Sequence, residues 1–230
     1  MKEETKMRIF VGYDTREDIA YQVCKHSIVS KQPNAKVQPL KQQELRDAGW
    51  YTRPKDKLAS TEFTFTRFLI PELMNFKGWA VFMDCDMILT TDIKELFDQV
   101  DDKYAVMCVQ HDYTPKEGIK MDGQKQTIYP RKNWSSVMLF NCAHPSNARL
   151  TQDMVNSPEL NGAYFHRFSW LKDEEIGELN HTWNYLVGVY DDIETPKLIH
   201  YTEGGPWFEN YRHCQYNQLW KHELFDMMND

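Results

Sequence analysis

The chain has 230 residues, of which 41% are apolar and 27% charged, and 27 basic against 34 acidic side chains give it a net charge of -7. This length and apolar content are typical of one larger α/β domain and exclude a disordered chain. The acidic balance, without a concentrated positive face, excludes a nucleic acid as the expected partner.

The N-terminal region and the cysteines predict where the protein is located. Residues 1–10 are charged and run directly into a strand-like segment, without an apolar signal region, and no stretch approaches the length of a membrane span. The five cysteines are odd in number and irregular in spacing, which favours a reducing compartment over a disulfide framework. We therefore expect a cytoplasmic protein without a transmembrane segment.

The first predicted elements are a strand and the helix that follows it. Residues 8–13 form a short β-rich run that ends at helix-starting residues. From Ile19 the apolar positions follow helical spacing, with Asp14 or Thr15 as the expected N-cap. This segment therefore predicts the opening of a βα unit.

The next segment is harder to assign. Residues 36–40 predict a second short strand, and the polar, aromatic run 50–57 is typical of a loop. Within 60–74, the alternation of residues 63–66 favours a strand, whereas the apolar density that follows favours a buried helix with one proline. Periodicity alone leaves both interpretations open for this segment.

The strongest predicted strand is Trp79 to Met83, an entirely apolar run. Residues 90–92 are expected to cap a short helix that ends at Phe97. Further strands are predicted at 104–109, 136–140 and 197–200. Strands separated by helices or long crossings indicate a mostly parallel sheet in an α/β layer, and no repeat or linker divides the chain.

An acidic turn, Asp84-Cys85-Asp86, follows the strongest strand directly. In an extended chain residues i and i+2 point the same way, so both carboxylates can face one point at the carboxyl edge of the sheet. Two oxygen donors there suit Mg²⁺ or Mn²⁺, which leave positions open for diphosphate oxygens. The alternative is a structural turn, which aspartate also favours, but the apolar run 87–89 predicts sheltered carboxylates that need a partner.

Four segments, in this order, together resemble the GT-A fold glycosyltransferases, and specifically family 8, the group with glycogenin and bacterial galactosyltransferases. The segments are Arg8 to Asp14, Thr66 to Leu73, Val81 to Asp86 and Ile199 to Trp207. The resemblance implies a Rossmann-like, mostly parallel sheet flanked by helices in a single domain, 1–230. Its core would be 8–207, with 208–230 packing on it or contacting an acceptor or second subunit. It also favours a helix at 66–73.

Site residues follow from the resemblance by position. The implied metal ligands are Asp84, Asp86 and His200, and Arg67 would contact the donor, with an ion pair to a nearby acid as the alternative. The other implied donor-binding residues are Val11, Gly12, Tyr13, Asp14, Cys85, Ser136, Gly204 and Gly205. Asp84 and Asp86 are also the implied catalytic residues, together with Asp173, which could stabilise the sugar cation or simply begin a solvated helix.

The function implied by the resemblance is hexosyl transfer from a UDP-sugar, with Mn²⁺ or Mg²⁺ and retention of configuration, to a carbohydrate, lipid-linked or protein acceptor that the sequence does not identify. A sugar nucleotidyltransferase is the enzyme alternative, although residues 12–15 lack its glycine-rich, basic loop. A carbohydrate-binding protein is the non-enzyme alternative, because the chain has 7 Trp and 12 Tyr. A homo-oligomer is left open.

Overall fold

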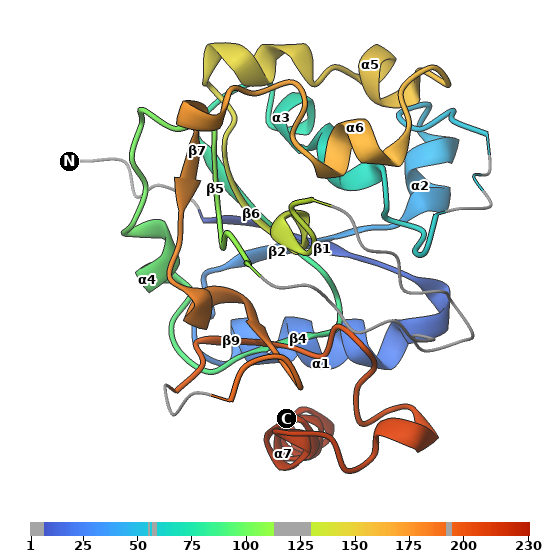
Figure 1. Cartoon of the computed structure of the whole chain (residues 1–230). Helices are drawn as coiled ribbons and strands as arrows, with labels where there is room; N and C mark the ends of the chain where they lie inside the picture. Colours follow the sequence, from blue (N-terminus) through green and yellow to red (C-terminus); the bar gives the residue numbers. More distant parts are fainter. Residues whose placement is uncertain (1–6, 55, 57–58, 113–129, 192–194) are drawn as a thin grey trace.

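The computed structural model describes residues 7–54, 56, 59–112, 130–191 and 195–230, which form an α/β fold built around one central sheet (Figure 1). In strand order β2-β1-β3-β6-β5-β7, this sheet has six strands. Its strands are β1 (Arg8–Gly12), β2 (Lys36–Leu40), β3 (Trp79–Met83), β5 (Val106–Cys108), β6 (Val137–Asn141) and β7 (Ile176–Glu178).

Most of the central sheet is parallel, as predicted. β1 runs parallel to both β2 and β3, and β5 runs parallel to β7, whereas β6 is antiparallel to its two neighbours β3 and β5. Every residue of β3 and β6 is buried, and all of them except Asn141 are apolar, as is typical of strands that are covered on both faces. The central strands therefore form the middle of the core.

A second, smaller sheet was not predicted. It has the order β4-β9-β8, with β4 (Met87–Leu89), β9 (Leu198–His200) and β8 (Tyr185–Leu186). β4 pairs with β9 in antiparallel register, so that Met87 lies opposite His200. Of these three strands, only β9 was expected, at 197–200. The sheet brings the chain after the acidic turn alongside a segment more than a hundred residues later.

Helices cover both faces of the central sheet. Figure 1 shows α1 on one side and α3, α5 and α6 on the other. The α-helices are α1 (Asp18–Val29), α2 (Gln42–Asp47), α3 (Ile70–Leu73), α4 (Lys94–Phe97), α5 (Gln152–Asn156), α6 (Gly162–His166) and α7 (Asn217–Asn229). Short 3-10 helices span Thr15–Glu17, Thr66–Leu69, Trp134–Ser136, Pro145–Arg149, Asp173–Glu175, His181–Asn184 and Glu209–Tyr211. Within the described ranges, no helix has the length and apolar character needed to cross a membrane.

The helix predictions are confirmed with shifted boundaries. Asp14 is an N-cap, as expected, but it caps the 3-10 helix before α1, where its carboxylate accepts a hydrogen bond from the backbone N–H of Arg16. The segment 66–73 is helical, whereas 60–65 forms turns and bends. Pro71 lies in the first turn of α3, where its missing N–H has no intrahelical acceptor to lose. Asp92 accepts a hydrogen bond from the N–H of Lys94 at the start of α4.

The C-terminal helix α7 packs against α1 on the side away from the central sheet (Figure 1). Trp220 is its one buried residue, and its ring centroid lies 5.4 Å from that of Trp207. Both belong to a second apolar cluster that includes Val23 of α1, Ile88 of β4 and Ile199 of β9. α7 therefore packs, through Trp220, into the apolar cluster that includes residues of the small sheet.

Candidate active site

The acidic turn lies between the two sheets. Asp84 follows β3, and its backbone N–H donates to the carbonyl of Ser136 at 3.0 Å. Two residues later, the carbonyl of Asp86 accepts from the N–H of Tyr201 at 2.9 Å. Each aspartate is thus tied by its backbone to a different sheet, which fixes the direction of both side chains.

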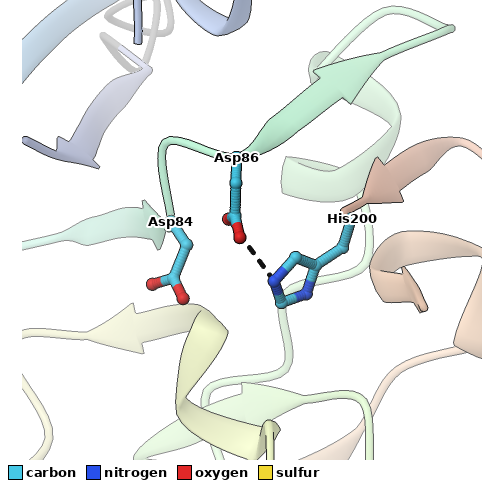
Figure 2. Close-up of side chains that lie close together, drawn as sticks. All are labelled: Asp84, Asp86 and His200. Carbon is cyan, nitrogen blue, oxygen red and sulfur yellow. Dashed lines mark ion pairs between the residues drawn. The ribbon is translucent and has the colours of Figure 1, made fainter. Parts of the chain in front are cut away.

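Three side chains converge at this turn: the carboxylates of Asp84 and Asp86 and the imidazole of His200 (Figure 2). Their potential ligand atoms all lie within 4.8 Å of one another. Nε2 of His200 is 3.4 Å from Oδ1 of Asp86, and His200 is only 2% exposed. The sequence-predicted cluster is therefore assembled, although His200 lies far from the two aspartates in the chain.

The donor set and its spacing fit a divalent cation. Around an ion with bonds of about 2.1 Å, neighbouring ligands lie about 3 Å apart and opposite ligands about 4 Å. The 3.4 Å between Nε2 of His200 and Oδ1 of Asp86 is close to the spacing of neighbouring ligands, and the 4.8 Å limit of the cluster exceeds that of opposite ligands by less than about 1 Å. Two carboxylates and one imidazole suit Mn²⁺, which accepts a nitrogen ligand more readily than Mg²⁺ does.

The electrostatic surroundings of the cluster are acidic. Glu17, at the N-terminal end of α1, is 3% exposed, and its Oε2 is fully buried with no hydrogen-bond partner among the described residues. Burial and the nearby charges of Asp86, Asp14 and Asp84 raise the pKa of Glu17 to about 8, although the charge of Arg16 opposes this. A buried carboxyl group beside further acidic side chains is an environment that favours a cation.

Arg67 is held rigidly beside Asp84. Its Nη1 lies 2.8 Å from Oδ1 of Asp84 and 2.8 Å from the carbonyl oxygen of Ser135, and its Nε donates to the carbonyl of Phe63 at 3.2 Å. The guanidinium also stacks over the ring of Phe82, at 4.6 Å from its centroid. The ion pair considered as an alternative for Arg67 is therefore present. A contact with the donor stays a prediction.

The residues predicted to line the nucleotide pocket lie where β1 ends, next to the end of β3. Val11 pairs with Met83 across these parallel strands, so the residue after each strand lies at the same edge of the sheet. Val11 and Asp14 are fully buried. A Cβ at Gly12 would come within 2.5 Å of the ring of Phe63, which explains glycine there by packing.

Tyr13 and Asp14 are engaged by neighbouring side chains. The hydroxyl of Tyr13 donates to Asp18 at 2.7 Å, which, with burial and nearby acidic charges, raises the pKa of Tyr13 to about 12. The carboxylate of Asp14 accepts from the guanidinium of Arg16 at 2.8 Å and from the N–H of Glu62 at 3.2 Å. Burial raises the pKa of Asp14, but these contacts outweigh it and lower the pKa overall.

The glycine segment after His200 makes room for aromatic rings. Gly204 has a φ of 138°, a conformation that favours glycine, and a Cβ there would lie 2.7 Å from the ring of Tyr211. A Cβ at Gly205 would overlap the ring of Trp207. Packing against Tyr211 and Trp207 thus accounts for both glycines, and a backbone contact with phosphate stays a prediction.

The other predicted site residues differ in how close they lie to the cluster. Cys85 is buried inside the acidic turn, and burial with nearby acidic groups raises the pKa of its thiol well above the usual range. Ser136 is buried next to the turn, as part of a hydrogen-bond network described below. The side chain of Asp173 is 87% exposed and pairs with Arg131 at 2.5 Å, outside the three-residue cluster.

One residue next to the cluster was missed by the sequence analysis. Asn184 is fully buried, and its Oδ1 lies 2.9 Å from Nδ1 of His200. In the sequence, Asn184 is an isolated asparagine after Trp183, and nothing in that local pattern singles it out.

Comparison with known proteins decides the family. The model of glycosyl transferase family 8 matches residues 4–211. The chain belongs to this family. It is a glycosyltransferase. The Arabidopsis thaliana protein named Protein CDI is 53% identical over 228 residues, an alignment that covers 96% of this chain and 87% of that protein.

Solved structures confirm the GT-A fold of this family 8 chain. The glycosyltransferase GlyE of Streptococcus pneumoniae TIGR4 superposes with a TM-score of 0.65 at 16% identity over 98% of this chain. This chain covers 63% of the GlyE chain, less than two thirds of its length. The galactosyltransferase LgtC, solved with donor and acceptor sugar analogues, gives a TM-score of 0.58 at 11% identity, with 96% of each chain covered.

Proposed function

We propose that this family 8 chain transfers a sugar from a UDP-sugar, with Mn²⁺ or Mg²⁺ as cofactor and with retention of configuration, to an acceptor that is not yet identified. The convergence of Asp84, Asp86 and His200 within 4.8 Å carries this proposal. Asp84 and Asp86 lie at the carboxyl end of β3, next to the end of β1, which is the place where ligands bind in open α/β sheets.

The three clustered side chains would hold the cation. When bound, it supplies positive charge to the diphosphate leaving group, the main electrostatic demand of this reaction. Asp86 and His200 are buried, so they hold their positions before any ligand arrives. An acidic site of this kind would otherwise repel a diphosphate, which makes the cation a condition of donor binding.

Arg67 has a second role in the proposal, as a direct donor contact. Among the described residues none accepts a hydrogen bond from its Nη2, although Nη1 and Nε are both engaged. Nη2 is also not among the fully buried polar atoms that lack a partner, so it keeps a small contact with solvent, although Arg67 as a whole is only 4% exposed. A planar fork with one side fixed to Asp84 and one side open suits an oxygen of the diphosphate.

The remaining donor contacts are proposed by position. Val11, Gly12, Tyr13 and Asp14 at the end of β1 would line the nucleotide pocket, and Cys85, Ser136, Gly204 and Gly205 would lie around the donor. Asp173 is the proposed carboxylate near the sugar, and it would have to leave Arg131 to act there. We also propose a cytoplasmic location, because all five cysteines are free thiols.

Donor hydrolysis tests this function without knowledge of the acceptor. The protein is incubated with a panel of nucleotide sugars and manganese, and release of the nucleoside diphosphate is followed over time. We expect slow hydrolysis of one UDP-sugar, abolished by chelator and reduced at least about 100-fold in Asp86→Asn, which keeps the shape but removes the charge. Hydrolysis that persists in Asp86→Asn would reject the metal role, and formation of a nucleotide sugar from a nucleoside triphosphate would identify a nucleotidyltransferase instead.

A further inference from the structure

We infer, on the basis of the proposed metal site, that Asn184 is a positioning residue that fixes His200 in the tautomer able to bind the cation through Nε2. Asn184 ends the 3-10 helix His181–Asn184, directly before β8, the strand that pairs with the strand carrying His200. It is fully buried and touches His200 on the side opposite Asp86. It therefore contacts a ligand of the cation rather than the cation itself.

The orientation of the Asn184 amide follows from its neighbours. Nδ2 lies 3.2 Å from the carbonyl oxygen of Asn133 and 2.8 Å from Oγ of Ser136. A backbone carbonyl only accepts hydrogen bonds, so the amide atom that faces it has to be the nitrogen. The reversed amide would place two acceptor oxygens against each other inside the protein, which is strongly unfavourable.

The tautomer of His200 then follows from the amide. With Nδ2 directed at Asn133, Oδ1 of Asn184 faces Nδ1 of His200 at 2.9 Å. An amide oxygen only accepts, so Nδ1 has to carry a proton and donate it. In the neutral ring Nε2 is then left with a lone pair, directed toward Oδ1 of Asp86 at 3.4 Å. A cation bound between these two atoms needs that lone pair.

The same network reaches the other aspartate of the cluster. Oγ of Ser136 donates to the carbonyl of Asn133 at 2.6 Å, while the carbonyl of Ser136 accepts from the N–H of Asp84 at 3.0 Å. Asn133 has a φ of 61°, which closes the turn that presents its carbonyl to both partners. One short segment, 133–136, thus holds Asp84 through its backbone and His200 through Asn184.

The first test is the affinity of the protein for manganese, measured by calorimetry in the presence of UDP. Replacement of Asn184 by Leu removes the acceptor at Nδ1, and the affinity should fall by roughly 10- to 100-fold, as for other partners of metal-bound histidines. Thermal melting of the metal-free protein reports how much of the change is general destabilisation.

Asn147 offers a matched control. It is also fully buried, its Nδ2 donates to the carbonyls of Ala105 and Asn141 at 2.7 and 2.8 Å, and its Oδ1 accepts from Trp170 at 3.1 Å. Asn147→Leu therefore loses the same kind of buried amide at a place away from the metal cluster. We expect a comparable loss of melting temperature and an unchanged affinity for manganese.

The second test needs no variant of Asn184. NMR of the wild-type protein with isotope-labelled histidine, Mg²⁺ and UDP shows which ring nitrogen of His200 carries the proton, with His200→Ala assigning the signal. We expect the proton on Nδ1. A proton on Nε2, or an Asn184→Leu protein that binds manganese as tightly as the wild type, would overturn the role of Asn184 alone. A wild-type protein that binds no manganese with UDP would instead reject the metal site itself.

Discussion

Nη1 of Arg67 lies 2.8 Å from Oδ1 of Asp84, so the residue predicted to hold the donor is also the partner of a predicted metal ligand. The two side chains are 5% and 17% exposed, which keeps water from screening the pair. If the same guanidinium also contacts the donor, as proposed, changes in metal binding, donor binding and stability are coupled at this position.

Arg67→Ala should therefore lower stability as well as donor affinity. Loss of the guanidinium leaves the Asp84 carboxylate in a mostly buried site without its cation, at a cost of about 3 kcal/mol in the free energy of unfolding. The donor KM should rise at the same time, because the open Nη2 is lost. Chemical denaturation and steady-state kinetics measure the two effects.

Asp84→Asn in the Arg67→Ala background separates these effects. Neutralising Asp84 should restore part of the lost stability, since no buried charge is then left unpaired, while donor binding should stay impaired because a proposed metal ligand is lost as well. A donor KM that stays at the wild-type value in Arg67→Ala would show that Arg67 acts only as the ion-pair partner of Asp84.

UDP binding should require a divalent cation. The diphosphate would face the carboxylates of Asp84 and Asp86, and like charges at this distance oppose binding. Calorimetric titration of UDP with manganese, and again with excess chelator, measures the effect. We expect binding to fall below detection in chelator. Equal affinity in both titrations would remove the cation from the proposed mechanism.

How much of this site was predictable depends on how far apart in the chain the contacting residues lie. The strand β3 and the turn from Asp84 to Asp86 were predicted because an apolar run and an acidic turn are local patterns. The family resemblance added His200, which the strand pairing brings next to Asp86. The environment of Asn184 was not predictable, since its partners lie 16, 48 and 51 residues away in the chain.

The strands that the sequence did not predict are short. β4 and β8 have three and two residues, too few to show the two-residue period of a strand, and they are extended because β9 pairs with both. The antiparallel direction of β6 is likewise set by the path of the chain around the sheet, and no pattern within residues 137–141 specifies it.

The docking of α7 on α1 should weaken as the pH rises. Nδ1 of His26 lies 2.6 Å from Glu223 of α7, and its Nε2 lies 2.9 Å from Asp230. Burial lowers the pKa of His26, but the hydrogen bonds to Asp230 and Glu223 raise it overall. The resulting stabilisation is complete below the ordinary imidazole pKa of about 6.5 and is lost as the pH rises through the higher value of the folded protein.

His26→Gln should accordingly flatten the decrease in unfolding free energy that begins as the pH rises above about 6.5. The control is His222→Gln, because His222 lies on α7 itself but its side chain is 73% exposed. Denaturant titrations across this range measure the slope for all three proteins. Identical slopes in the wild type and His26→Gln would show that another group causes the dependence.

His200→Ala tests the contact that joins the two most specific segments of the sequence. His200 lies 114 residues after Asp86 (200 - 86 = 114), yet its Nε2 is 3.4 Å from the Asp86 carboxylate. If Nε2 is a ligand, manganese should support more activity than magnesium in the wild type, and this preference should shrink in His200→Ala. The variant should need at least roughly 10-fold more manganese for half-maximal donor hydrolysis, and excess manganese should partly restore its rate. A merely structural histidine would lower the melting temperature without moving the manganese titration, so superimposable titration curves would show that His200 is not a ligand.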